Sequence, residues 1–329
     1  MVPWLRHMAG KIASLTILHM DKISENRLLP ALPTLPRLEV LQILGLEDVD
    51  LDFRWITQLL EGSPDLRSLS LSGVSGLESS TSLKNVAARL THVSIGALSH
   101  VDYHFPLRID AVLEVILACT GLQSLECHAL TAEDIDEPPA VTLPSLSSLS
   151  IGDGPETCLI LKYLYVPRLR SFRLVRGRIL NENEEEVDIP FVDDARDGYS
   201  QLFVECLRRL HETCSPQIAK VIWDCTTVDL CVLDNCVPYF QAMAELECHG
   251  LAKIGPCNFL SSDSNEIAYP HLRSMSFTRC ILGAITSGAI EAVINWGGPP
   301  LPPITRLIVE DCKGASDKYL SLSSHKDEE

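Results

Sequence analysis

Seven cysteines gather in one third of this 329-residue chain, and their thiols could bind a metal ion. Structural zinc is normally held by ligand pairs about two to four residues apart, and the narrowest pair here, Cys231 and Cys236, is spaced more widely. We therefore expect buried free thiols and no metal, with a zinc-binding cysteine-rich protein as an alternative. The group comprises Cys206, Cys214, Cys225, Cys231, Cys236, Cys248 and Cys257, with His211 and His249 nearby.

Glycine-containing segments could mark a catalytic or cofactor site. The run Gly73-Val74-Ser75-Gly76 lacks the G-x-S-x-G spacing of a nucleophile elbow, and Gly152-Asp153-Gly154 lacks the third glycine of a dinucleotide-binding loop. The sequence also contains no G-x-x-x-x-G-K-[ST] phosphate-binding loop. We expect no catalytic residues, no cofactor and a protein that is not an enzyme.

A leucine-type triplet, L-x-x-L-x-L, recurs eleven times, and such a repeated pattern could build a partner-binding surface. Successive triplets open 23 to 32 residues apart, apart from one interval of 49, which suggests a degenerate repeat or an insertion. In seven cases a proline stands two residues ahead of the triplet, where it ends a preceding helix and favours an extended segment. The triplets open at Ile12, Leu38, Leu66, Leu90, Leu122, Leu146, Leu169, Ile218, Met243, Leu272 and Ile304.

Each triplet predicts a short strand with one buried and one exposed face. The fourth and sixth positions are two apart and point into the core, so the third, fifth and seventh positions face outward. The outward positions of the early strands are rich in serine, and charge gathers from Glu126 onward. The candidate partner-binding residues are Glu126, His128, Arg173, Lys220, Asp224, Glu245, Glu247 and His249.

Helices are predicted between the strands, because apolar residues there follow a period of about 3.6. The clearest stretches are 53–60, 112–119, 202–210 and 285–294. A strand and a return helix in tandem predict an α/β solenoid of about 11 irregular repeats, a horseshoe with a parallel inner sheet and outer helices. Its concave face is the expected binding surface, since solenoids use such faces for recognition.

The repeats resemble leucine-rich repeats, in particular the irregular kind in fungal-type F-box proteins. The longer family signature, with Cys or Asn three residues after the sixth position, is met in full only from Leu272 to Leu282, where Cys280 takes that place. The resemblance implies a non-enzymatic protein-interaction module, the substrate-recognition part of an F-box-type ubiquitin-ligase adaptor. The alternative is a free-standing scaffold or inhibitor unrelated to ubiquitin.

No F-box is recognisable in this chain, because the first triplet already opens at Ile12. A Skp-type adaptor is therefore an expected partner only if an F-box lies upstream. The formal net charge of −17 disfavours nucleic acid and anionic membranes as partners.

We expect one leucine-rich-repeat domain over residues 1–320, with an acidic insertion at about 181–199 and a disordered polar tail at 321–329. The first twenty residues lack the continuous apolar stretch of a secretory signal, and no segment has about 18 uncharged apolar residues in a row. We therefore expect a cytoplasmic or nuclear protein.

Overall fold

The fold is taken from a computed structural model, in which the chain divides into two compact units. Unit 1 holds residues 1–147, 163–166 and 177–189, and unit 2 holds residues 148–162, 167–176 and 190–329. The structure describes residues 7–20, 34–45, 59–72, 81–96, 107–128, 130–132, 138, 140–152, 154–175, 193–224, 232–250, 269–281 and 305–312.

Unit 1 is built on five long parallel strands that follow one another in chain order. Two short parallel pairs, β5 with β7 and β8 with β10, accompany them. The long strands are β1 (Ser14–Met20), β2 (Val40–Gly45), β3 (Ser68–Ser72), β4 (His92–Ile95) and β6 (Ser124–Cys127). The short ones are β5 (Leu107–Arg108), β7 (Leu130–Thr131), β8 (Val141–Thr142) and β10 (Leu164–Tyr165).

The described part of unit 2 has six parallel strands, again in chain order, so strands that follow one another in sequence are neighbours in the sheet. They are β9 (Ser148–Gly152), β11 (Ser171–Val175), β12 (Lys220–Asp224), β13 (Glu245–His249), β14 (Ser274–Thr278) and β15 (Arg306–Glu310).

The triplet positions predict these strands correctly. All eleven long strands begin two residues after the opening residue of a triplet, as β3 does after Leu66 and β12 after Ile218. The fourth and sixth positions are buried in most strands, whereas the positions between them are partly exposed, as the buried Leu69 and Leu71 of β3 show. Parallel strands in chain order, repeated at this spacing, make the chain a leucine-rich-repeat solenoid.

The prolines ahead of the triplets lie in tight turns. Pro36, Pro64, Pro144 and Pro270 each follow a residue whose carbonyl accepts a hydrogen bond from the N–H three residues on. Proline is favoured at this second turn position because its fixed φ suits the turn. Pro216 differs, since it follows Ser215, which has a positive φ of 41° at the end of a helix.

Helices connect the strands, and two of the predicted ones are confirmed, as α5 and α7. Residues 59–61 are helical, but the rest of the first predicted helix and the stretch 285–294 lie outside the described residues. Of the expected acidic insertion, residues 193–199 belong to α7, and 181–192 lie outside the described residues, as does the tail at 321–329. The helices are α4 (Thr81–Ala87), α5 (Ile109–Leu117), α6 (Pro155–Cys158), α7 (Asp193–Cys214) and α8 (Val232–Cys236), with 3-10 turns η1 (Ala9–Lys11), η4 (Leu159–Tyr163) and η5 (Val237–Tyr239).

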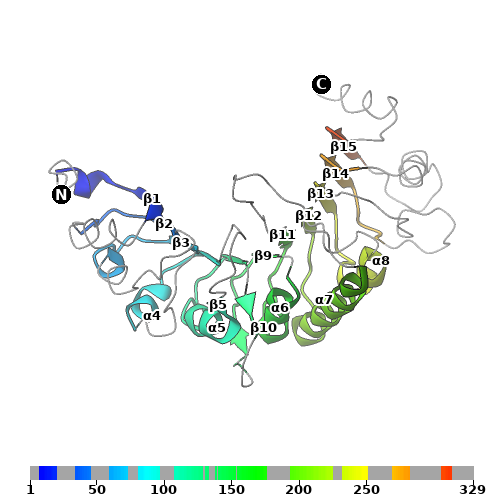
Figure 1. Cartoon of the computed structure of the whole chain (residues 1–329), viewed down its shortest axis with the longest axis horizontal. Coiled ribbons are helices and arrows are strands. Elements are labelled where there is room, and N and C mark those ends of the chain that lie inside the picture. The colour runs from blue at the N-terminus through cyan, green and yellow to red at the C-terminus, as the bar shows by residue number, and fades with distance from the viewer. Residues whose placement is uncertain are drawn as a thin grey trace. The chain divides into compact units, whose positions relative to one another are not determined.

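In unit 2 the helices α6, α7 and α8 lie on one side of the strands (Figure 1). An aromatic cluster joins the two layers: the ring of Phe203 on α7 meets Trp223 of β12 edge-on at 5.8 Å and lies 6.1 Å from Phe172 of β11. The opposite side of β11, β12 and β13 carries the outward positions. None of the described helices is long and apolar enough to cross a membrane.

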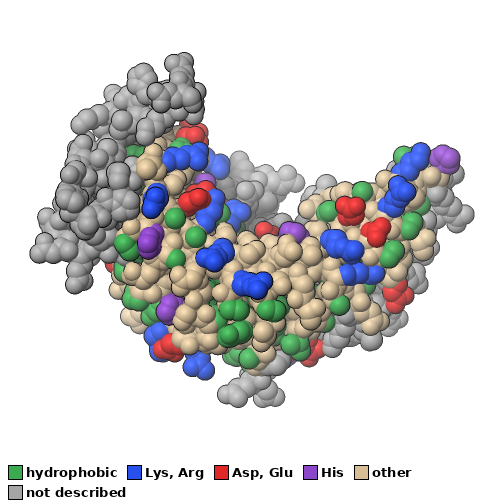
Figure 2. All heavy atoms as spheres, turned by 180° about the vertical axis from the view of Figure 1, so that it is seen from behind, with side chains coloured by type: hydrophobic (Ala, Val, Ile, Leu, Met, Phe, Trp, Pro, Cys, Tyr) green, Lys and Arg blue, Asp and Glu red, His purple; other side chains and the backbone are tan. Residues whose placement is uncertain are grey.

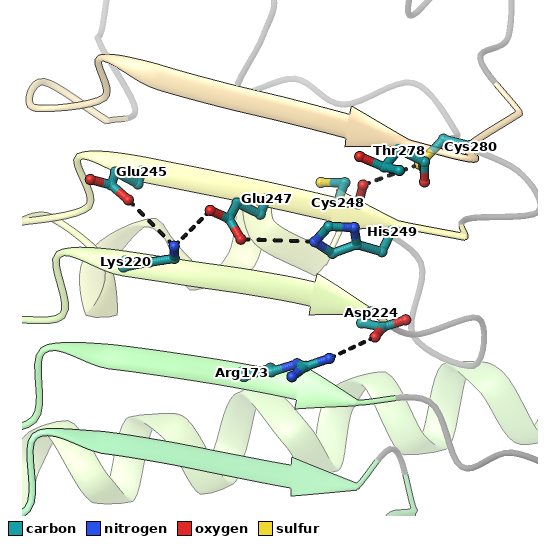
Figure 3. Close-up of polar contacts among 9 residues, drawn as sticks. All are labelled: Arg173, Lys220, Asp224, Glu245, Glu247, Cys248, His249, Thr278 and Cys280. Atoms are coloured by element: carbon teal, nitrogen blue, oxygen red, sulfur yellow. Dashed lines mark hydrogen bonds and ion pairs between the residues drawn. The ribbon is translucent and has the colours of Figure 1, made fainter. Parts of the chain in front are cut away.

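The cysteine of the longer repeat signature has a visible structural role. The thiol of Cys280 lies 3.4 Å from the carbonyl oxygen of Cys248 in the preceding repeat, to which it donates (Figure 3). Cys312 makes the same contact one repeat later, with its sulfur 3.4 Å from the carbonyl oxygen of Phe277. These thiols satisfy backbone carbonyls at the strand ends, which is why a small donor is favoured there.

Candidate functional site

Six of the eight candidate residues lie together on the outward positions of three neighbouring strands of unit 2. We call this surface the charged face and define it by those residues and Ile222. Strand β11 supplies Arg173, β12 supplies Lys220, Ile222 and Asp224, and β13 supplies Glu245, Glu247 and His249. The register pairs Arg173 with Ile222 and Ile222 with Glu247, so the three occupy one row across the sheet.

An ion pair joins the first two strands of the charged face. Nη2 of Arg173 donates to Oδ2 of Asp224 at 3.0 Å, diagonally from β11 to the end of β12 (Figure 3). The two side chains are 42% and 30% exposed, so water and salt screen the attraction. A pair of this kind contributes little stability, about 0–1 kcal/mol, but it fixes the direction of two otherwise flexible side chains.

A second pair joins β12 to β13. Nζ of Lys220 lies 2.6 Å from Oε1 of Glu247 and 3.6 Å from Oε2 of Glu245, so the ammonium sits between two carboxylates (Figure 3). The hydrogen bond to Glu247 raises the pKa of Lys220 because it stabilises the charged form. A lysine held in its charged form is a poor nucleophile or base, because both roles need the neutral amine and therefore a lowered pKa.

His249 extends the same network at the end of β13. Its Nε2 lies 3.8 Å from Oε2 of Glu247, and this contact is an ion pair only when the imidazole is protonated. Glu247 is therefore shared between Lys220 on one side and His249 on the other. The two acidic groups near Lys220 leave this corner of the charged face with spare negative charge at neutral pH.

Ile222 is a face residue that the sequence reasoning missed. It is partly exposed at the fifth position of its triplet, with Arg173 and Glu247 beside it in register and Lys220 and Asp224 on the same strand. The signal was available, because an aliphatic residue at an outward position is unusual in a strand that is otherwise charged on that side. The result is an apolar centre surrounded by two ion pairs.

The remaining two candidates belong to unit 1. Glu126 occupies a partly exposed position on β6. His128 lies beyond the end of β6 and is only 6% exposed, in contrast to the outward position that its place in the triplet predicts. Its backbone explains the difference: the His128 N–H donates to the carbonyl of Ile95 at 2.9 Å, which holds the residue against the end of β4.

The cysteines do not form a metal site within the described residues. No three His, Cys, Asp or Glu side chains in that part of the chain could hold a metal ion, and Cys225, Cys231 and Cys257 lie outside it. Cys248 is fully buried at an inward position, as expected for a core thiol. The sulfur atoms of Cys206 on α7 and Cys158 on α6 lie 3.9 Å apart, and their hydrogen bond together with burial raises the pKa of Cys158.

No protein-family model and no curated protein matches the chain. Among solved structures, a Bacteroides fragilis protein is similar at a TM-score of 0.47 and 12% identity, over 86% of this chain and 68% of that one. The leucine-rich-repeat-containing protein LegL7 from Legionella pneumophila is similar at a TM-score of 0.41 and 15% identity, over 90% of this chain and 83% of that one. At these scores the likenesses carry no functional argument, and the repeat assignment rests on the strands and turns of the chain itself.

Proposed function

We propose that this chain is a non-enzymatic protein-interaction module that binds a protein partner on the charged face. The observation that supports this is the apolar Ile222 enclosed by the ion pairs Arg173–Asp224 and Lys220–Glu247. Binding energy at protein interfaces concentrates in such central positions, with a polar ring that keeps water out.

The ion pairs favour binding in a second way. Long charged side chains lose conformational freedom when a partner immobilises them, at a cost of about 0.5–1.5 kcal/mol each. On the charged face, Arg173 and Lys220 are already held by Asp224 and Glu247 before any partner arrives. A partner that docks there orders fewer side chains than it would on an unpaired surface.

The finer proposal follows from the resemblance to F-box proteins. In that reading the partner is a substrate for ubiquitin transfer, and a Skp-type adaptor binds only if an F-box lies upstream of this chain. The second reading is a free-standing scaffold or inhibitor that uses the same face. Glu126 and His128 of unit 1 stay proposed contacts in both readings, although the burial of His128 makes its contribution depend on local rearrangement.

Substitutions at the charged face test the main proposal. Partners would be identified by cross-linking to the wild-type chain, and their affinity for purified variants would then be measured. We expect Ile222→Asp to weaken binding at least about tenfold, since a carboxylate replaces the apolar centre. Ser70→Asp, at the equivalent outward position of β3, is the matched control and should leave the affinity unchanged.

A charge exchange separates recognition from folding. Arg173→Asp combined with Asp224→Arg keeps an ion pair between the same positions but reverses the order of the charges. We expect this variant to fold as the wild type does and to lose partner binding. If Ile222→Asp and the exchanged pair both bind as tightly as the wild type, the partner does not use the charged face.

A separate experiment distinguishes the ubiquitin reading from the scaffold reading. The gene product, together with whatever sequence precedes this chain, would be mixed with a purified Skp-type adaptor and analysed by size-exclusion chromatography. Co-elution supports the ligase adaptor. A folded protein that elutes apart from the adaptor supports the free-standing scaffold.

A further inference from the structure

Four exposed arginines of unit 2 lie in the turns before the strands or at the strand starts. Arg168 is in the turn before β11, Arg170 and Arg273 directly precede β11 and β14, and Arg306 is the first residue of β15. We call these four residues the basic rim. They lie at the amino-terminal edge of the strands, where the charged face also begins with Lys220 and Glu245, in the same register row as Arg306.

The backbone of the basic rim is fixed while its side chains are open to solvent. The carbonyl of Arg170 accepts hydrogen bonds from the N–H groups of Ala219 and Lys220 at 2.8 and 3.0 Å. The carbonyl of Arg273 likewise accepts from Thr305 and Arg306 at 2.9 and 3.2 Å. The backbone of Arg170, Arg273 and Arg306 is therefore held in place, which reduces the entropy that binding must overcome.

The guanidinium groups of the rim are also without partners among the residues that the structure describes. None of the four forms a side-chain hydrogen bond or an ion pair within the described part of the chain. Elsewhere in that part, Arg173 and Arg208 are neutralised by carboxylates. In a chain with 27 basic and 44 acidic residues, four arginines that have no carboxylate partner among the described residues are not explained by a shortage of carboxylates.

Acidic residues are missing from the turns along the same edge. The turn positions before β11, β12, β13 and β14 that the structure describes in unit 2 hold no Asp or Glu, whereas unit 1 has Glu39 and Asp65 at its corresponding positions. The first residue of β13 is acidic, but the carboxylate of Glu245 lies 3.6 Å from the ammonium of Lys220. Figure 2 shows Lys and Arg side chains recurring across the visible surface, where Asp and Glu side chains also occur. The four arginines thus give the rim of unit 2 a local positive charge against the net −17 of the whole chain.

The surface between Arg170 and Arg273 carries only small side chains at the equivalent strand positions. Between Arg170 and Arg273 lie β12 and β13, whose residues at the same position are Ala219 and Ala244. Three strand spacings of about 4.8 Å put the two arginine positions about 14 Å apart. An extended peptide rises about 3.3 Å per residue, so this distance spans about four of its residues.

We propose that the basic rim binds a short acidic segment of a partner protein, extended across β12 and β13, with carboxylates about four residues apart. Arginine suits this role because its planar guanidinium binds a carboxylate through two parallel hydrogen bonds. Nucleic acid is a poorer fit, since its charge density meets a strongly acidic protein and the described rim offers no aromatic side chain for base stacking. The rim proposal is independent of partner binding on the charged face.

Fluorescence anisotropy with labelled peptides tests this proposal on the full chain. One peptide carries glutamates about four residues apart, and a second has the same composition with its glutamates adjacent. We expect the spaced peptide to bind more tightly, and its affinity to fall as salt is raised, because the contacts are exposed ion pairs.

Charge-reversal variants locate the site. Arg170→Glu and Arg273→Glu should each weaken binding of the spaced peptide at least about tenfold. Arg209→Glu is the matched control, because Arg209 is an exposed residue of α7 with the same charge change and lies outside the rim. Circular dichroism and thermal unfolding would show that all three variants fold alike.

The possible outcomes are distinct. Loss of binding in both rim variants with retention in Arg209→Glu supports the proposal. Equal loss in all three variants would show a general charge effect and overturn it, as would tighter binding of a single-stranded oligonucleotide or an anionic lipid vesicle than of the peptide. Because Ile222→Asp leaves the rim intact, failure of the rim and failure of the charged face can be told apart.

Discussion

Gly96→Ala should destabilise unit 1 far more than an ordinary glycine substitution. Gly96 follows β4 with a φ of +122°, a conformation that residues with a side chain rarely adopt. A Cβ added there would lie 1.9 Å from the carbonyl oxygen of His128 and 2.9 Å from its nitrogen. These are backbone atoms, so no side chain can turn away to make room.

The expected magnitude follows from what must move. The N–H of Gly96 donates to Leu71 at 3.0 Å, and the N–H of His128 donates to Ile95 at 2.9 Å, so relief of the clash strains or breaks both bonds. Each bond contributes about 1 kcal/mol, and the unfavourable φ adds about 1–2 kcal/mol. Overpacking adds a further cost of about 1–3 kcal/mol, so we expect the free energy of unfolding to fall by at least about 4 kcal/mol.

Gly250→Ala is the matched control. Gly250 follows β13 in the same way and has a φ of +62°, but an added Cβ would meet nothing within 4 Å. Only the cost of the positive φ applies, so we expect the free energy of unfolding to fall by about 1 kcal/mol. The difference between the two variants therefore measures the clash with His128.

Urea unfolding combined with hydrogen exchange of individual peptides would check both values, because the two units can then be followed separately. Protection of the β4 and β6 peptides should collapse in Gly96→Ala, and protection of the β13 peptide should fall only slightly in Gly250→Ala. Equal losses in the two variants would refute the assigned packing of the β4 and β6 ends.

Three further predictions concern single groups. Trp223→Ala should cost about 3–5 kcal/mol in urea unfolding, because a fully buried indole leaves a cavity; a loss under about 1 kcal/mol would contradict the inward position. Cys280→Ala should cost about 1 kcal/mol through the lost thiol bond to Cys248, with Cys280→Ser retaining part of it, and identical unfolding curves would argue against the bond. The pKa of Asp110 is lowered, first by its hydrogen bond from Arg108, so its stabilising contribution is complete above the ordinary aspartate pKa and is lost as pH falls through the lower folded value. Carboxyl NMR titration should show that pKa rising in Arg108→Ala, and an unchanged pKa would assign the shift to another cause.

The strand positions were predictable because a single local rule generates them. Two apolar residues spaced two apart must share a face, and a proline-led turn starts each strand at a fixed distance from them. The same rule assigned Trp223 and Cys248 to the interior and Lys220 and Glu247 to the exterior, as the structure confirms. It failed at His128, because β6 ends at Cys127 and the N–H of His128 is bonded to the carbonyl of Ile95 at the end of β4.

The ion pairs of the charged face were not predictable. Arg173 and Asp224 are 51 residues apart in sequence, across the interval of 49 residues that suggested a degenerate or displaced repeat. In the sheet β11 pairs directly with β12, and the 22-residue helix α7 occupies part of the connection. Aligning the triplets predicts which residues lie side by side on neighbouring strands. It does not predict that a side chain leans diagonally and contacts a residue of the next row.

The helix α7 also decides which residues the charged face presents. Side chains alternate with a period of two, so a slip of one residue in β12 would bury Ile222 and expose Trp223. The edge-on contact between Trp223 and Phe203 of α7 opposes that slip, because no other residue of β12 could fill the same space. The face that carries Ile222 is thus set by packing on the opposite side of the sheet. A substitution such as Phe203→Ala should therefore weaken partner binding without touching the charged face, whereas a substitution on the outer surface of α7 should not.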